Sequence, residues 1–270
     1  MSLARYVPPQ DARTADWLGH GNWRLLFYIL GLYIGIVKVL LPQYMINRKE
    51  YKLLGVIRTY NFLLIIVNVF FLYNLGTKTY FGGGYSWFCQ GLDRTNPDLS
   101  ILRINYSYMF VRMFEFLDTV FFVLRKKYSQ VTFLHVSHHC LAIILPWCGI
   151  QYGIDGQACL MVVFNMTEQI LMYTYYFLSS FPFFRPYLGW KRYLTLFQIV
   201  QFAVIGIHMT LPLLYDCNYP ILNSLTVVTA FVYFFLMFLV FYLSTYRKRS
   251  LSASKCSLEL QEIDQSRKIT

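Results

Sequence analysis

The chain has 270 residues, of which 57% are hydrophobic and 14% are charged, and its formal net charge is +11. So large an apolar fraction excludes an ordinary soluble domain and predicts an integral membrane protein. No basic patch stands apart from the apolar segments, which argues against a nucleic-acid partner.

Several segments are long and apolar enough to cross a bilayer, which takes about 20 residues. We predict spans at residues 24–46, 53–75, 103–124, 131–150, 157–180, 192–214 and 221–245. The expected fold class is therefore an all-α integral membrane protein with seven transmembrane helices. We expect an N-terminal segment (1–22), the seven-helix domain (23–246) and a basic, disordered tail (247–270).

Most of the 24 basic residues lie in segments 47–52, 125–127, 181–192 and 246–270. By the positive-inside rule these segments face the cytosol, which places the C-terminus in the cytosol and the N-terminus on the opposite side. The charge either only sets topology and attracts anionic lipid, or also forms a basic mouth for a polyphosphate ligand such as coenzyme A. Cys89 and Cys217 then lie on the oxidising side, and we expect a disulfide between them.

The third predicted span carries charges along one helix face, because Arg112, Glu115 and Asp118 are three residues apart. An unpaired Arg or Asp at mid-span costs about 2.5–3.5 kcal/mol, so these groups must pair or line water. An Arg112–Glu115 ion pair would be a purely structural explanation, but it leaves Asp118 unexplained.

The fourth predicted span contains His135, His138 and His139. Offsets of three and four residues bring their imidazoles onto one helix face. Histidine is costly in a membrane, and its neutral ring is a nucleophile, a proton carrier and a metal ligand. The three rings therefore predict a reaction site.

Polar side chains also follow one side of the fifth and sixth spans. They are Asn165, Glu168, Gln169, Tyr173, Tyr176, Thr195, Gln198 and Gln201. Two explanations fit Gln198 and Gln201, because buried amides either bind a ligand or only hold helices together. Spans three to six would together enclose a polar site within an apolar wall, which suits a ligand with a reactive head and a long apolar tail.

Four runs in these spans resemble, in order and spacing, the signature boxes of the very-long-chain fatty acid elongases. The runs are residues 112–119, 135–139, 165–176 and 195–201. Val136 after the first histidine is similar to the branch that handles long saturated, monounsaturated or polyunsaturated chains. The resemblance implies a multi-pass enzyme of the endoplasmic reticulum membrane, in which six of seven helices form a barrel around an enclosed acyl tunnel open to the cytosol.

The implied enzyme is a 3-oxoacyl-CoA synthase, an acyltransferase that joins a long-chain acyl-CoA to malonyl-CoA and releases CO2 and CoA. It needs no cofactor and no metal. Its implied partners are membrane lipid, the reductases and dehydratase of the elongation cycle, and further copies or relatives of itself in an oligomer. The resemblance also implies the luminal disulfide between Cys89 and Cys217.

The resemblance suggests that His138 forms an acyl-imidazole, and we assign His135 and His139 to orientation, proton transfer or enolate stabilisation. Glu115 and Asp118 are expected to fix the histidine tautomers. The expected substrate-binding residues are Arg112, Asn165, Gln169, Tyr173, Tyr176, Gln198 and Gln201.

Two positions depart from the pattern of many relatives. Gln169 stands where they have a histidine that is implicated in handling the acyl group, and glutamine is neither a base nor a nucleophile. Arg112 replaces a lysine, which keeps the charge but changes the donor geometry. Either the box histidines suffice, or activity is reduced or redirected.

Two other classes remain as alternatives. A membrane di-iron desaturase or hydroxylase also uses H-x-x-H-H, but its iron ligands require several histidine clusters, and this chain has 5 histidines in all. A zinc site on the three box histidines fits by count, although the H-E-x-x-H pattern is absent. A lipid transporter, channel or receptor would use the polar stripe as a pathway, but an alternating-access carrier usually shows repeats, and none is visible.

Overall fold

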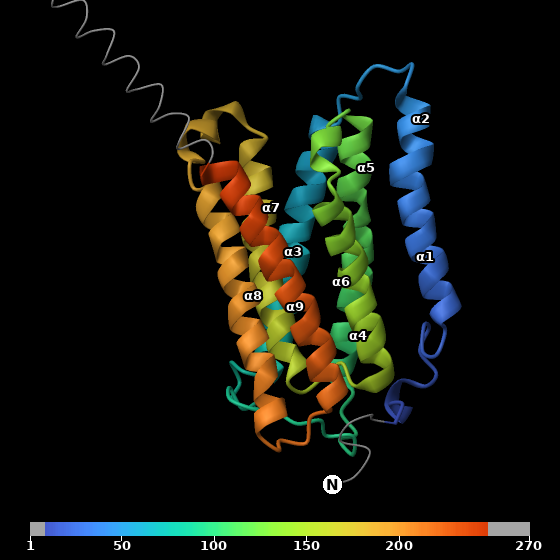
Figure 1. Cartoon of the computed structure of the whole chain (residues 1–270), viewed down its shortest axis with the longest axis vertical. Coiled ribbons are helices and arrows are strands. Elements are labelled where there is room, and N and C mark those ends of the chain that lie inside the picture. Colours follow the sequence, from blue (N-terminus) through green and yellow to red (C-terminus); the bar gives the residue numbers. More distant parts are fainter. Residues whose placement is uncertain (1–8, 248–270) are drawn as a thin grey trace, which may run out of the picture.

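The computed structural model describes residues 9–247, and its long elements are helices that lie side by side (Figure 1). In chain order they are α1 (Trp23–Gly35), α2 (Leu41–Met45), α3 (Leu54–Lys78), α4 (Ser100–Phe114), α5 (Phe116–Leu124), α6 (Phe133–Tyr152), α7 (Ala158–Ser179), α8 (Lys191–Leu214) and α9 (Ile221–Tyr242). A π-helical turn, Ile36–Leu40, joins α1 to α2. The predicted tail lies outside the described residues except for Arg247.

Within residues 9–247, 5 helices are long and apolar enough to cross a membrane: Trp23–Met45, Leu54–Lys78, Phe133–Tyr152, Lys191–Leu214 and Ile221–Tyr246. Large apolar side chains such as Phe27, Phe70 and Ile207 are exposed on the outside of the bundle. Exposed apolar surface of this extent is what a lipid environment accommodates. The chain is therefore a multi-pass membrane protein with an all-helical fold.

The packing of the helices forms a closed circuit. Helix α3 packs on α7, α7 on α8, α8 on α9, α9 on α6, α6 on α4, and α4 again on α3. Helix α1 lies outside this circuit against α6, at the edge of the bundle in Figure 1. The circuit places the polar faces of α4 to α8 where they can share one interior.

Local sequence explains where the site helices begin and break. Thr132 caps α6, because its side chain accepts a hydrogen bond from the backbone N–H of His135 at 3.1 Å. The predicted third span, 103–124, is interrupted at Glu115, where α4 ends and α5 begins. The backbone N–H of Asp118 bonds the carbonyl of Glu115 at 3.0 Å, a tighter turn than the α-helical spacing allows.

Loops close one end of the bundle. A disulfide joins Cys89 to Cys217 with their Cα atoms 5.9 Å apart, and it ties the loop after α3 to the loop before α9. The loop between α6 and α7 packs beside them and begins at Gly153, whose φ is +119°. This φ is one that L side chains rarely adopt, and a Cβ atom at Gly153 would also lie 2.5 Å from Leu92 Cδ1, so the position favours glycine.

Candidate functional site

A cavity of about 200 Å³ lies inside the helical circuit. Its polar lining includes Arg112, His138, Asn165 and Gln201, from four different helices. The rest of the lining is mostly apolar, with Leu145, Met161, Val162 and Phe231, but it also includes Asn105, Asn223 and Thr226. The cavity then continues to Tyr152, Gly153 and Ile154, at the closed end of the bundle. This arrangement offers a polar head site followed by an apolar channel.

The three box histidines lie together on α6, but their surroundings differ. The rings of His135 and His139 are 4.4 Å apart, and those of His138 and His139 are 5.9 Å apart and perpendicular. His139 is buried, and of the three only His138 lines the cavity. His138 is therefore the imidazole placed to meet a ligand there.

The ring of His135 shares a hydrogen bond with a threonine. Its Nε2 atom lies 2.8 Å from Thr119 Oγ1, which in turn lies 2.8 Å from the hydroxyl of Tyr33. We expected Glu115 and Asp118 to orient the histidines. In this structure Glu115 contacts Arg112 and Asp118 contacts Tyr173, while the side-chain hydrogen-bond partner of the His135 ring is Thr119.

Arg112 is the centre of a buried polar group on α4. Its Nη1 atom lies 2.6 Å from Glu115 Oε2, and the two residues are 4% and 1% exposed. The carbonyl oxygen of Gln169, with the amide oriented by its partners, accepts from Arg112 Nη2 at 3.1 Å and also from Nη1. The ion pair weighed as a structural explanation is thus present, but Arg112 also lines the cavity.

Two tyrosines that we expected to bind substrate lie in different environments. Tyr173 is fully buried, and its hydroxyl donates to Asp118 Oδ2 at 2.7 Å. Tyr176 is 36% exposed. Neither is among the residues that line the cavity, and the ring of Tyr176 lies 6.1 Å from that of Tyr173.

The structure places Gln198 and Gln201 in different surroundings, and so distinguishes a link between helices from a ligand-binding amide. Gln198 Nε2 donates to Glu168 Oε1 at 2.5 Å and so joins α8 to α7. Gln201 lines the cavity, and its Oε1 atom is buried without a hydrogen-bond partner among the described residues. Gln198 is therefore a link between helices, whereas Gln201 has an acceptor available to a ligand.

Sequence reasoning missed some of the residues that support the site. Tyr108 lines the cavity, and its hydroxyl donates to Asn68 Oδ1 at 2.8 Å and lies 3.4 Å from Asn165 Oδ1. Tyr33 and Asn68 come from helices with no marked polar face, and only their partners reveal their role. Thr119 lay within the charged run of the third span and could have been assigned from its spacing.

The profile described as "ELO: GNS1/SUR4 family" matches residues 18–254 of the chain. The chain belongs to this family. It is 38% identical over 247 residues to "Very long chain fatty acid elongase 4" of Mus musculus, a match that covers 88% of this chain and 77% of the relative. The resemblance inferred from the four boxes is therefore confirmed.

Other relatives in the ELO family match at similar levels. The chain is 34% identical over 255 residues to "Very long chain fatty acid elongase 5" of Mus musculus, covering 94% of this chain and 85% of that one. It is 36% identical over 251 residues to "Very long chain fatty acid elongase 2" of Rattus norvegicus, covering 89% and 86%. The family match at residues 18–254 includes the cavity lining and the box histidines.

Proposed function

We propose that this ELO family member is the condensing enzyme of fatty acid elongation, a 3-oxoacyl-CoA synthase whose substrates are a long-chain acyl-CoA and malonyl-CoA. The relatives' names support fatty acid elongation as the process. The observation that carries the proposal is the position of His138, at the polar end of a cavity that continues between apolar side chains. An acyl chain would fill the apolar part and present its thioester to the imidazole.

The condensation can be written with the groups that line this end of the cavity. A ring nitrogen of His138 attacks the acyl thioester carbonyl and the C–S bond breaks. The departing CoA sulfur takes up the proton that the imidazole ring loses on acylation, and CoA leaves as the thiol. Malonyl-CoA then loses CO2, and the resulting enolate carbon attacks the acyl-imidazole. The new C–C bond forms, the C–N bond to His138 breaks, and the departing ring nitrogen takes up one proton from solvent, so that the free imidazole and 3-oxoacyl-CoA remain.

Arg112 and Asn165 supply the electrostatic part of the proposed reaction. Both line the cavity beside His138, and both carry N–H donors. Donors fixed in a site that excludes water stabilise charge that develops on a carbonyl oxygen. In the proposal they bind the thioester and enolate oxygens, while the apolar wall keeps water from hydrolysing the acyl-imidazole.

The proposal includes the place of the enzyme in the cell. We place it in the endoplasmic reticulum membrane with the N-terminus luminal, the C-terminus cytosolic and seven crossings, of which α4 with α5 forms one and α7 another. The packing circuit described above supports a six-helix barrel with α1 outside it. The basic cytosolic loops would meet the CoA phosphates, and the product would pass to the reductases and dehydratase of the cycle.

Expression in yeast cells that lack their own elongases tests the proposed function. The wild-type chain should lengthen supplied fatty acids, and His138→Ala should abolish the new products, because no other cavity-lining imidazole is present among the described residues. Gas chromatography of total fatty acid methyl esters gives the readout.

A matched histidine substitution controls for folding. His208 lies on α8 outside the cavity lining, next to the side chain of Gln157. His208→Gln should keep the ability to elongate. Identical fatty acid profiles from the wild type and His138→Ala would contradict the assignment of His138.

A further inference from the structure

The N-terminal segment before α1 is bound to the closed end of the bundle. The backbone N–H of Asp11 donates to the carbonyl of Gln151 at 2.7 Å, and Thr14 Oγ1 donates to the carbonyl of Ile150 at 2.5 Å. Both acceptors are in the last turn of α6, whose carbonyls have no partner within the helix. Asp11 and Thr14 are 1% and 0% exposed, so this segment is part of the folded core.

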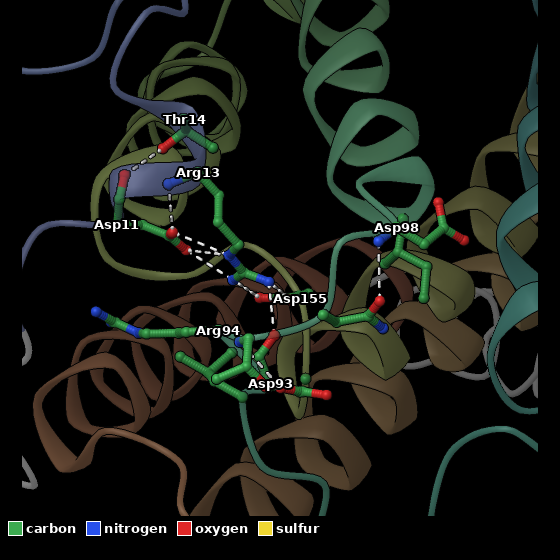
Figure 2. Close-up of polar contacts among 12 residues, drawn as sticks. Asp11, Arg13, Thr14, Asp93, Arg94, Asp98 and Asp155 are labelled. Atoms are coloured by element: carbon green, nitrogen blue, oxygen red, sulfur yellow. Dashed lines mark hydrogen bonds and ion pairs between the residues drawn. The ribbon is translucent and has the colours of Figure 1, made fainter.

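Arg13 joins this segment to two loops through what we name the Arg13 cluster, the side chains of Asp11, Arg13 and Asp155 (Figure 2). Arg13 Nη2 lies 2.7 Å from Asp11 Oδ2, and Nη1 lies 3.0 Å from Asp155 Oδ2. Nη1 also donates to the carbonyl of Asp93 at 2.8 Å. One guanidinium thus connects the N-terminal segment, the loop after α3 and the loop between α6 and α7.

Arg13 favours the ionised form of both carboxyl groups that it contacts. Burial acts to raise the pKa of Asp11, but the hydrogen bonds and charge of Arg13 outweigh it and hold that pKa below its ordinary value. Burial raises the pKa of Asp155 despite its bonds from Arg13. A buried ion pair that loses one partner leaves an uncompensated charge, so the guanidinium is needed for the loop to keep its position.

The loop held by Asp155 also forms the end wall of the cavity. Gly153 and Ile154, directly before Asp155, line the cavity together with Tyr152. The carbonyl of Tyr152 accepts two further hydrogen bonds, from Arg94 Nη2 at 3.0 Å and from Asn223 Nδ2 at 3.3 Å. Along the axis of α6, Tyr152 in this wall is about 21 Å from His138, at 1.5 Å per residue.

From this geometry we propose that Arg13 is a specificity-determining residue, which fixes the length of acyl chain that the enzyme accepts by holding the wall of Tyr152, Gly153 and Ile154 across the end of the cavity. The inference rests on the proposed function, because it assigns the apolar part of the cavity to the acyl tail. Arg13 acts as a positioning residue, since it contacts the wall through Asp155 and does not touch the substrate.

The physical consequence is a defined chain-length limit. A terminal methyl group that reaches a fixed wall can advance only by displacing it, which breaks the buried bonds of Arg13. Without Arg13, the loop of Asp155 is released on that side and a longer tail can enter. The limit should therefore move toward longer chains while the chemistry at His138 stays unchanged.

The test is the product range of Arg13→Leu in full-length protein, expressed in elongase-deficient yeast and supplied with saturated fatty acids of increasing length. We expect the longest product to gain at least one elongation step over the wild type. Arg24→Leu is the matched control, because Arg24 is an exposed arginine at the N-terminal end of α1. This substitution should leave the chain-length limit unchanged. Arg13→Lys keeps the charge but not the bidentate geometry, and it should give an intermediate limit.

The outcomes separate the inference from the proposed function. A wild-type chain that lengthens no fatty acid contradicts the proposed function. If the wild type elongates but Arg13→Leu gives the same or a shorter longest product, the role of Arg13 is overturned, whatever the total yield. A residue with a merely structural role would lower the total yield without changing the longest product. If Arg13→Leu does not accumulate, Arg13→Lys and Asp155→Asn decide by the same measure.

Discussion

The guanidinium of Arg112 explains how glutamine fits at position 169. Arg112 is buried between the carboxylate of Glu115 and the amide carbonyl of Gln169, and both side chains accept hydrogen bonds from it. A buried cation requires such partners, because an unpaired one has a large desolvation cost. Gln169 therefore positions the group that lines the cavity beside His138, and the two departures from the family pattern are in direct contact.

Gln169→Leu should show what this contact contributes. The substitution keeps a similar volume but removes an acceptor from a charged donor, which typically costs about 1.5–3 kcal/mol. We expect a lower free energy of unfolding in detergent and a marked fall in elongation. Gln169→His retains one ring acceptor and should lose less than Gln169→Leu. If Gln169→Leu matches the wild type in both measurements, the hydrogen bond to Arg112 is unimportant.

The ion pair between Arg112 and Glu115 also affects the break between α4 and α5. Arg112 lies in the last turn of α4, and Glu115 occupies the junction itself, so their ion pair spans the point where the helix is interrupted. The pair is almost fully buried. Because removal of one partner leaves the other charge unpaired, the junction should be sensitive to single substitutions and tolerant of paired apolar ones.

Glu115→Leu should destabilise the protein by about 3–5 kcal/mol, because the guanidinium of Arg112 remains buried without its counter-charge. The double variant Arg112→Met/Glu115→Leu should recover most of this loss, yet should remain inactive in the elongation assay. Unfolding in mixed detergent micelles gives the free energies. A double variant no more stable than Glu115→Leu would show that the unpaired charge of Arg112 does not cause the loss of stability.

For the molecule as a whole, the closed end depends on links between segments distant in sequence. The disulfide between Cys89 and Cys217 closes a sequence separation of 128 residues, and the Arg13 cluster connects the N-terminal segment to two further loops. Both lie at the end of the bundle opposite the basic loops. The loops at the closed end are thus held by covalent and ionic links together.

Reduction of the disulfide should lower the free energy of unfolding by about 2–4 kcal/mol, because the unfolded chain regains the entropy of a long loop. The midpoint of thermal unfolding in detergent should fall when reductant is added to the wild type. Cys89→Ser/Cys217→Ser should start at the lower midpoint and show no response to reductant. If reductant leaves the unfolding midpoint of the wild type unchanged, the disulfide does not contribute this stability.

The sequence by itself determined the membrane class, the helical fold and the family, because apolar run length and the spacing of polar residues are local properties. The boundaries of the long helices lie close to the predicted spans for the same reason. It also identified His138 and Gln201 as candidates for the site, since a polar residue inside a span must have a partner or line a cavity.

Tertiary structure alone decided which candidates face the cavity and which pair with one another. Gln198 and Gln201 lie one helical turn apart on α8, yet one binds Glu168 and the other keeps an acceptor free. The role of Arg13 also could not be read from the chain, because Asp155 is 142 residues away and periodicity carries no information on contacts at that range. Packing between helices decides such contacts, whereas the sequence of one helix shows only which of its residues share a face.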